Sequence, residues 1–116
     1  MKNPLGSIDS LALSTEKTIG NLQLYRTETF TVTTRVVYNA AATAGIRLNM
    51  YFSPDAKNYD TIPYAYYDID FTAGATVQET KIVDAPEQGS MLLKVENLDA
   101  AQPATSIKVW TNLEIE

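Results

Sequence analysis

The sequence contains no cysteine and no histidine among its 116 residues. Without cysteine the chain cannot form a disulfide, a thiolate nucleophile, a zinc–thiolate site or an iron–sulfur cluster, and its absence fits synthesis in a reducing cytoplasm. Without histidine the chain lacks the commonest general base and the commonest transition-metal ligand. It has no glycine-rich phosphate-binding loop either. We therefore expect a protein that is not an enzyme, binds no cofactor and holds no metal ion.

Basic residues are also few, and they are scattered singly. The chain has 9 lysine and arginine residues against 14 aspartate and glutamate residues, which gives a formal net charge of −5. Because nucleic-acid binding needs a local excess of positive charge, we expect no nucleic-acid partner. No apolar stretch reaches the length of a signal peptide or a membrane span, so we expect no membrane partner and synthesis in the cytoplasm.

What the sequence does contain is a regular alternation of apolar and polar residues, clearest in residues 27–53. A period of two is typical of strands with one buried and one wet face. Similar short segments, separated by turn-forming residues, follow towards the end of the chain. The sequence predicts an all-β protein, a single antiparallel β-sandwich that is Ig-like or jelly-roll-like, with about 7–8 strands. The apolar positions of the clearest pair are Phe30, Val32, Val36, Tyr38, Ile46, Leu48, Met50 and Phe52.

Residues 1–24 differ from residues 25–116, which we assign to the sandwich domain. Proline, glycine and serine interrupt this first segment, and its apolar spacing fits neither the helix nor the strand period. Two interpretations are open: a first strand that closes the domain's own sheet, or an extended N-terminal arm that docks on a neighbouring subunit. In the second, the apolar side chains that bind the partner are Leu5, Ile8, Leu11 and Leu13.

Aromatic residues supply the other candidate contacts. Tyr51 falls on the wet side of its strand, and Tyr64 and Tyr66 share one side of the segment that follows. Trp110, the single tryptophan, stands on the polar side of the last strand. Exposed aromatic rings provide rigid contact area, which suits protein interfaces and sugar sites. We take these four residues as candidate partner-binding residues, with packing at the margins of the core as the alternative.

A short acidic segment between the strands is a candidate calcium loop. Asp55, Asn58 and Asp60 offer the oxygen ligands that calcium prefers. Their spacing is not that of an EF-hand, because the glycine and the terminal glutamate of that loop are missing. The composition favours the alternative, in which these side chains shape a turn by bonding to the backbone.

Two segments resemble a known class of protein. Residues 51–61 resemble the strand–turn–strand pattern y-S-x-D-G-x-x-W-x-T of many β-sandwich and propeller proteins. Ala56 stands in place of the usual glycine, and Tyr59 stands at the position of the usual aromatic residue. Residues 93–99 followed by 107–110 are similar to the closing hairpin of small sandwich domains. Together, over residues 27–113, they resemble small virion structural proteins of tailed phages and prophages. The resemblance implies a head-decoration, neck or tail component that works in assembly, and it assigns no functional residue.

Two hypotheses follow for the function. The first is a non-enzymatic structural protein of a phage virion, made in the host cytoplasm, that binds copies of itself or a larger virion protein. The second is a carbohydrate-binding or adhesion module that uses the tyrosine-rich surface, with a glycan as its partner. Both hypotheses describe a protein that binds other molecules and catalyses no reaction.

Overall fold

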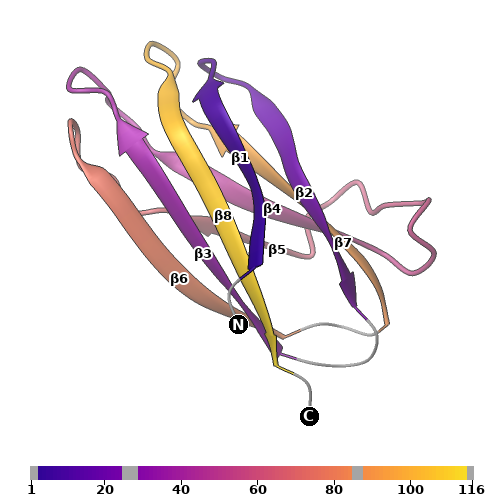
Figure 1. Cartoon of the computed structure of the whole chain (residues 1–116). Helices are drawn as coiled ribbons and strands as arrows, with labels where there is room; N and C mark the ends of the chain where they lie inside the picture. The colour runs from indigo at the N-terminus through magenta and orange to yellow at the C-terminus, as the bar shows by residue number, and fades with distance from the viewer. Residues whose placement is uncertain (1–2, 25–28, 85–87, 115–116) are drawn as a thin grey trace.

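The computed structural model describes residues 3–24, 29–84 and 88–114. Eight strands account for most of these residues, and they lie in two layers that face each other (Figure 1). The strands are β1 (Asn3–Leu11), β2 (Glu16–Leu24), β3 (Thr29–Tyr38), β4 (Ile46–Ser53), β5 (Ala65–Asp68), β6 (Thr76–Asp84), β7 (Gly89–Asn97) and β8 (Ala104–Glu114).

The strand order identifies the topology. One sheet, called sheet A here, has the order β1-β8-β3-β6, and the other, sheet B, has the order β2-β7-β4-β5. Every neighbouring pair is antiparallel. Eight strands in two four-stranded sheets, with the chain passing back and forth between the sheets, form a jelly roll. The predicted antiparallel sandwich is confirmed, in its jelly-roll form.

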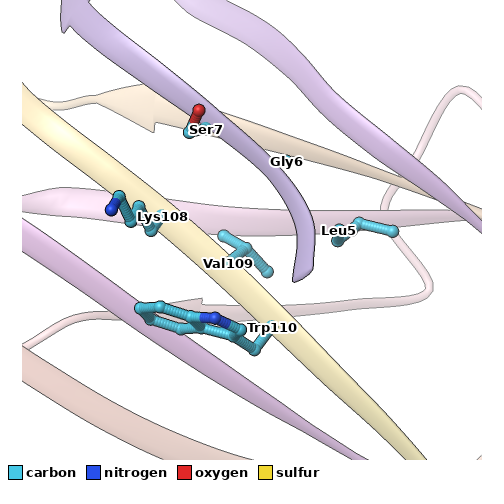
Figure 2. A pocket seen from close by; sticks show the side chains of 6 residues that line it. All are labelled: Leu5, Gly6, Ser7, Lys108, Val109 and Trp110. Carbon is cyan, nitrogen blue, oxygen red and sulfur yellow. The ribbon is translucent and has the colours of Figure 1, made fainter. Parts of the chain in front are cut away.

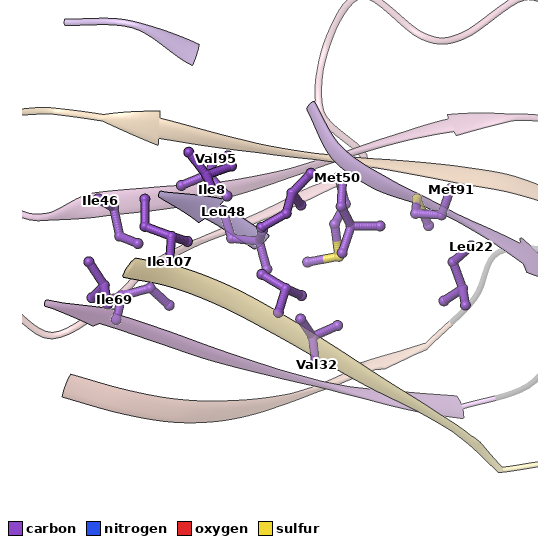
Figure 3. Close-up of a cluster of buried hydrophobic side chains, with 14 of the residues drawn as sticks. Ile8, Leu22, Val32, Ile46, Leu48, Met50, Ile69, Met91, Val95 and Ile107 are labelled. Carbon is purple, nitrogen blue, oxygen red and sulfur yellow. The ribbon is translucent and has the colours of Figure 1, made fainter. Parts of the chain in front are cut away.

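The core lies between the two sheets, as the alternation in the sequence requires. In β3 and β4 the apolar residues at every second position point inward, and Phe30, Val36, Ile46 and Met50 are completely buried. Side chains from both sheets meet there, with Ile8, Val32 and Ile107 from sheet A facing Leu48, Met91 and Val95 from sheet B (Figure 3). Each square ångström of apolar surface buried in this way contributes about 25 cal/mol.

Residues 3–24 form β1 and β2, which belong to opposite sheets and pair within the same chain with β8 and β7. Both strands are edge strands and carry a bulge, next to Gly6 in β1 and next to Gly20 in β2. The glycines allow the two edges to approach. A β-carbon on Gly6 would lie 2.1 Å from the carbonyl oxygen of Ile19, and one on Gly20 would lie 2.4 Å from Cγ of Leu5. The sandwich is therefore closed along this side by a close approach of β1 to β2, with the backbone of Gly6 against that of Ile19 and Gly20 against the side chain of Leu5.

The opposite side of the sandwich lies between the edge strands β5 and β6 and is closed differently. Tyr64 and Tyr67 donate their hydroxyl protons to the backbone oxygens of Asp84 and Ile82, at 3.0 Å and 3.5 Å. β5 is short because Pro63, directly before Tyr64, cannot supply a backbone N–H to the sheet. Two tyrosines thus link sheet B to the free edge of sheet A.

Candidate functional site

The outer face of sheet B carries the most organised group of polar and aromatic side chains among the described residues. Because the even-numbered residues of β4 fill the core, Arg47, Asn49 and Tyr51 point outward. Neighbouring strands place further residues beside them on the same face. We call this group the tyrosine face; its members are Glu16, Arg47, Asn49, Tyr51, Tyr66, Asp68, Lys94 and Glu96.

A buried amide organises the middle of the tyrosine face. Glu16 of β2 and Glu96 of β7 stand directly opposite each other, a placement that is unfavourable for two like charges. Nδ2 of Asn49 donates to both carboxylates, at 2.7 Å to Glu16 and 3.2 Å to Glu96. The Tyr51 hydroxyl donates to Glu16 as well, at 3.0 Å. One amide and one phenol thus bring donors to two opposed carboxylates.

The same contacts change the acidity of Tyr51. Partial burial, followed by the hydrogen bond to Glu16, raises the pKa of Tyr51 to about 12. The ammonium group of Lys94 lies 5.3 Å from the centre of the Tyr51 ring, which is within range of a cation–π contact. Tyr51 is therefore a neutral, fixed ring at neutral pH.

Tyr66 stands beside this group and is held by a charged neighbour. Nε of Arg47 donates to Oδ1 of Asp68 at 2.6 Å and Nη2 donates to Oδ2 at 3.3 Å. The hydrogen bond from Arg47 lowers the pKa of Asp68. The Arg47 guanidinium then lies 4.7 Å from the centre of the Tyr66 ring. Tyr66 remains 57% exposed, so a contact area is presented to solvent on an ordered support.

The loop between β4 and β5 lies at one end of this face. Tyr59 accepts a hydrogen bond from Nδ2 of Asn21 at 2.6 Å and donates to Oγ of Ser90 at 2.9 Å. These contacts join the loop to β2 and β7. The loop residue Ala56 has a φ of 61°, a left-handed conformation that explains why the resembling pattern has glycine at this position.

The candidate calcium loop is a turn held by its own acidic residue. The Asp55 carboxylate accepts hydrogen bonds from the backbone of Asn58 and Lys57, both at 2.9 Å, and from the side chains of Asn58 at 2.8 Å and Ser53 at 2.9 Å. These bonds, that from the Asn58 backbone first, hold the pKa of Asp55 well below its usual range. Within residues 3–24, 29–84 and 88–114, no three carboxylates come together as a metal site would require. That part of the chain also has no helix long and apolar enough to cross a membrane.

The structure separates the candidate residues that the sequence grouped together. Tyr51 and Tyr66 share the tyrosine face, whereas Tyr64 reaches across to β6. The grouping of Tyr64 with Tyr66 needs correction, because Tyr64 precedes β5 and follows Pro63, so strand alternation does not extend to it. Tyr64 is still 44% exposed at this margin of the sandwich.

The apolar residues of the first segment need a similar correction. Ile8 and Leu11 lie in the hydrophobic core and Leu5 packs against it, so a partner cannot reach Ile8 or Leu11 without opening the sandwich. Leu13, in the turn between β1 and β2, is 46% exposed. Of the four, it is the residue whose side chain is best placed to meet another molecule.

Trp110 lies on the outer face of sheet A, half-buried beside a shallow hollow of about 270 Å³. Leu5, Gly6, Ser7, Lys108, Val109 and Trp110 line this hollow (Figure 2). A second hollow, of about 240 Å³, is lined by Arg35, Val37, Ser106 and Lys108. Sequence reasoning missed Arg35 and Lys108 because they lie far apart in the chain, and only the register of β3 with β8 makes them neighbours.

Comparison with known proteins gives the fold class. By sequence, the chain matches no family model and no curated protein. By structure, it resembles the cowpea mosaic virus top component, with a TM-score of 0.60 and 12% identity over 98% of this chain and 86% of that chain. The Triatoma virus empty capsid gives 0.59 and 11% over 98% and 87%. A carbohydrate-binding module of Cellvibrio mixtus lichenase 5A, in complex with cellotriose, gives 0.54 and 12% over 100% and 87%.

These similarities define a class of architecture. At such low identity they establish the jelly-roll sandwich and nothing finer. That sandwich is shared by viral capsid proteins and by carbohydrate-binding modules, and the similarity covers most of the length of each of these three structures.

Proposed function

We propose that this chain is a non-enzymatic structural subunit of a phage virion, a capsid-decoration, neck or tail component that acts through protein–protein contacts. It is made in the host cytoplasm and carried into the particle. The observation that carries the proposal is the tyrosine face, with Tyr66 exposed on an ordered support of Arg47 and Asp68. The likeness to capsid subunits over nearly the whole chain supports it.

The composition of the tyrosine face suits an interface between proteins. Tyrosine and arginine are enriched where protein interfaces bind most strongly. Ordering side chains on binding costs free energy, and less is lost when hydrogen bonds already hold them. Arg47 is held by Asp68 and Tyr51 by Glu16 before any partner arrives. We therefore place the main assembly contact on the outer face of sheet B.

The experiment is size-exclusion chromatography with light scattering on the wild-type chain, Tyr66→Ala and Ile82→Ala over a range of concentrations. Ile82 is 68% exposed on sheet A. The substitution Ile82→Ala serves as the matched control, because it removes from sheet A an exposed apolar area similar to the one that Tyr66→Ala removes from sheet B. We expect oligomers for the wild type and Ile82→Ala and monomers for Tyr66→Ala. A wild-type chain that stays monomeric throughout would contradict self-assembly, and oligomers of Tyr66→Ala would exclude this face.

Carbohydrate binding is a second candidate that the same face favours. Amide and carboxylate groups beside aromatic rings are the usual means of binding sugar hydroxyls and sugar ring faces. Asn49, Glu16 and Glu96 supply the polar groups next to Tyr51. A glycan array is the test: binding that Tyr66→Ala abolishes and Ile82→Ala keeps would support a glycan partner, and an array without signal would remove this candidate.

A further inference from the structure

The outer face of sheet A places two positive charges side by side. Arg35 of β3 and Lys108 of β8 are direct cross-strand partners. Side chains so placed have β-carbons about 4.5–5.5 Å apart, and like charges in this arrangement repel. Both side chains are exposed. Within the part of the chain that the structure describes, the two ion pairs are Arg47–Asp68 and Lys81–Glu79, so neither Arg35 nor Lys108 has a carboxylate partner there.

Lys108 also joins two adjacent hollows of different character. The hollow of about 240 Å³ is lined by Arg35, Lys108, Ser106 and Val37, and its two charged residues are both positive. The hollow of about 270 Å³ is lined by the half-buried Trp110 and by Leu5, with Gly6 and Ser7 beside them, and apolar atoms make up the larger part of its wall. Figure 2 shows Lys108 and Trp110 following one another along β8, with Ser7 and Leu5 on the adjacent β1. A ligand spanning both hollows needs an anionic group and an apolar group next to each other.

We propose that this face binds an acidic and apolar peptide segment of a partner protein. A carboxylate of the segment lies between Arg35 and Lys108, and a neighbouring apolar side chain lies against Trp110. The carboxylate forms charge-assisted hydrogen bonds and removes the repulsion between the two cations. The choice of a protein partner rests on the proposed role in assembly, and it fits the apolar hollow better than a bare inorganic anion does.

The placement of the charges matters because the chain as a whole is acidic. With a formal net charge of −5, the molecule repels an acidic segment from most directions. The Arg35–Lys108 pair places two positive charges next to each other on sheet A, and the segment is drawn to them. An acidic segment is therefore attracted to this part of the surface, and its apolar side chain then contacts Trp110.

The test uses the full chain and a defined probe. A short peptide of alternating glutamate and leucine is titrated into the isotopically labelled protein, and the amide shifts are followed by NMR. We expect saturable shifts at Arg35, Lys108 and Trp110, and binding about tenfold weaker in Arg35→Gln and Lys108→Gln, since each loses a hydrogen bond to a charged group. Lys57→Gln, in the exposed loop between β4 and β5, is the matched control and keeps wild-type affinity.

Three outcomes overturn the proposal: no shifts at these residues, equal binding of a glutamine–leucine peptide, or equal binding of inorganic phosphate, which would mark a simple anion site. Tyr66→Ala is titrated in parallel and keeps wild-type binding. The result is therefore independent of whether the tyrosine face mediates assembly.

Discussion

At the scale of single residues, Asp99 shows how a carboxylate holds this sandwich together. It lies after β7 and is almost completely buried. Oδ2 accepts hydrogen bonds from the backbone of Thr43 at 2.7 Å and Ala44 at 3.2 Å, and Oδ1 accepts from Ala101 at 2.8 Å and Gln102 at 3.0 Å. One side chain thereby joins the β3–β4 loop to the β7–β8 loop.

These bonds make Asp99 a source of pH-dependent stability. The backbone N–H groups, that of Thr43 first, lower the pKa of Asp99 from 3.8 to about 2. A carboxyl group with a lowered pKa in the folded state stabilises the protein at every pH above its unfolded value, and this contribution is lost as the pH falls from near 4 towards about 2. Asp99→Asn keeps the shape of the side chain but removes the charge and one acceptor oxygen.

We expect Asp99→Asn to lower the melting temperature by several degrees at pH 7 and to differ less from the wild type at pH 2. The melting temperature of both proteins, measured by thermal unfolding from pH 7 down to pH 2, checks this. The difference between the two curves should narrow below pH 4. Parallel curves over the whole range would show that the charge of Asp99 does not stabilise the fold.

At the scale of strands, an irregular position in the backbone explains why the apolar spacing of the first segment, residues 1–24, does not follow the strand period. Ser106 in β8 has a φ of 50°, and around it Ala104 and Ile107, three positions apart, both face the core. Opposite them, Ile8 and Leu11 of β1 have the same spacing and are both buried. A single interruption therefore breaks the period of two in both strands. Sequence reasoning has no signal for it, since a serine in a left-handed conformation looks like any other serine.

The two glycines between β1 and β2 provide a prediction at this scale. A β-carbon on Gly6 would collide with the backbone oxygen of Ile19, which cannot move without shifting β2. A β-carbon on Gly20 would meet the side chain of Leu5, which can rotate away. We expect Gly6→Ala to destabilise the protein by about 1–3 kcal/mol and Gly20→Ala by less.

Urea unfolding of the two variants and the wild type measures the difference directly. Because both substitutions add the same methyl group to an edge strand, each is the matched control for the other. Equal losses would mean that the approach of β1 to β2 is no tighter at Gly6 than at Gly20.

At the scale of the whole molecule, the sequence predicts the layers but not their arrangement. The alternation in β3 and β4 predicts which side chains fill the core, because the period of two is set by the backbone itself. It does not predict which strands pair. The neighbours of β8 are β1 and β3, and neither adjoins it in sequence. Ile82 lies on the opposite side of β6 from Val77 and Val83 by its parity, and it is exposed because that side is the outer face of sheet A.

For the same reason, the candidate sites were predicted only in part. Tyr51 and Tyr66 are visible as residues on wet sides of strands, but their supports, Glu16 and Arg47, come from strands whose order the sequence does not contain. Arg35 and Lys108 appear in the sequence as two isolated charges. The tyrosine face is built from the four strands of sheet B, and the pair of charges from two strands of sheet A. Either surface can be recognised only when the order and register of these strands are known.

The same topology predicts slow folding. Among the described strands, β4 and β5 alone are both consecutive in the chain and paired; every other pairing joins distant segments. Closing long loops costs conformational entropy before the distant contacts form, so sandwiches of this kind fold in milliseconds to seconds rather than microseconds. Trp110, in the central strand β8, is the natural probe because β8 pairs with both β1 and β3. Stopped-flow refolding followed by its fluorescence, at several protein concentrations to separate folding from assembly, should show a main phase in that range. A main phase faster than a millisecond would mean that local contacts, and not the pairing of β8 with its distant neighbours, limit the folding of this chain.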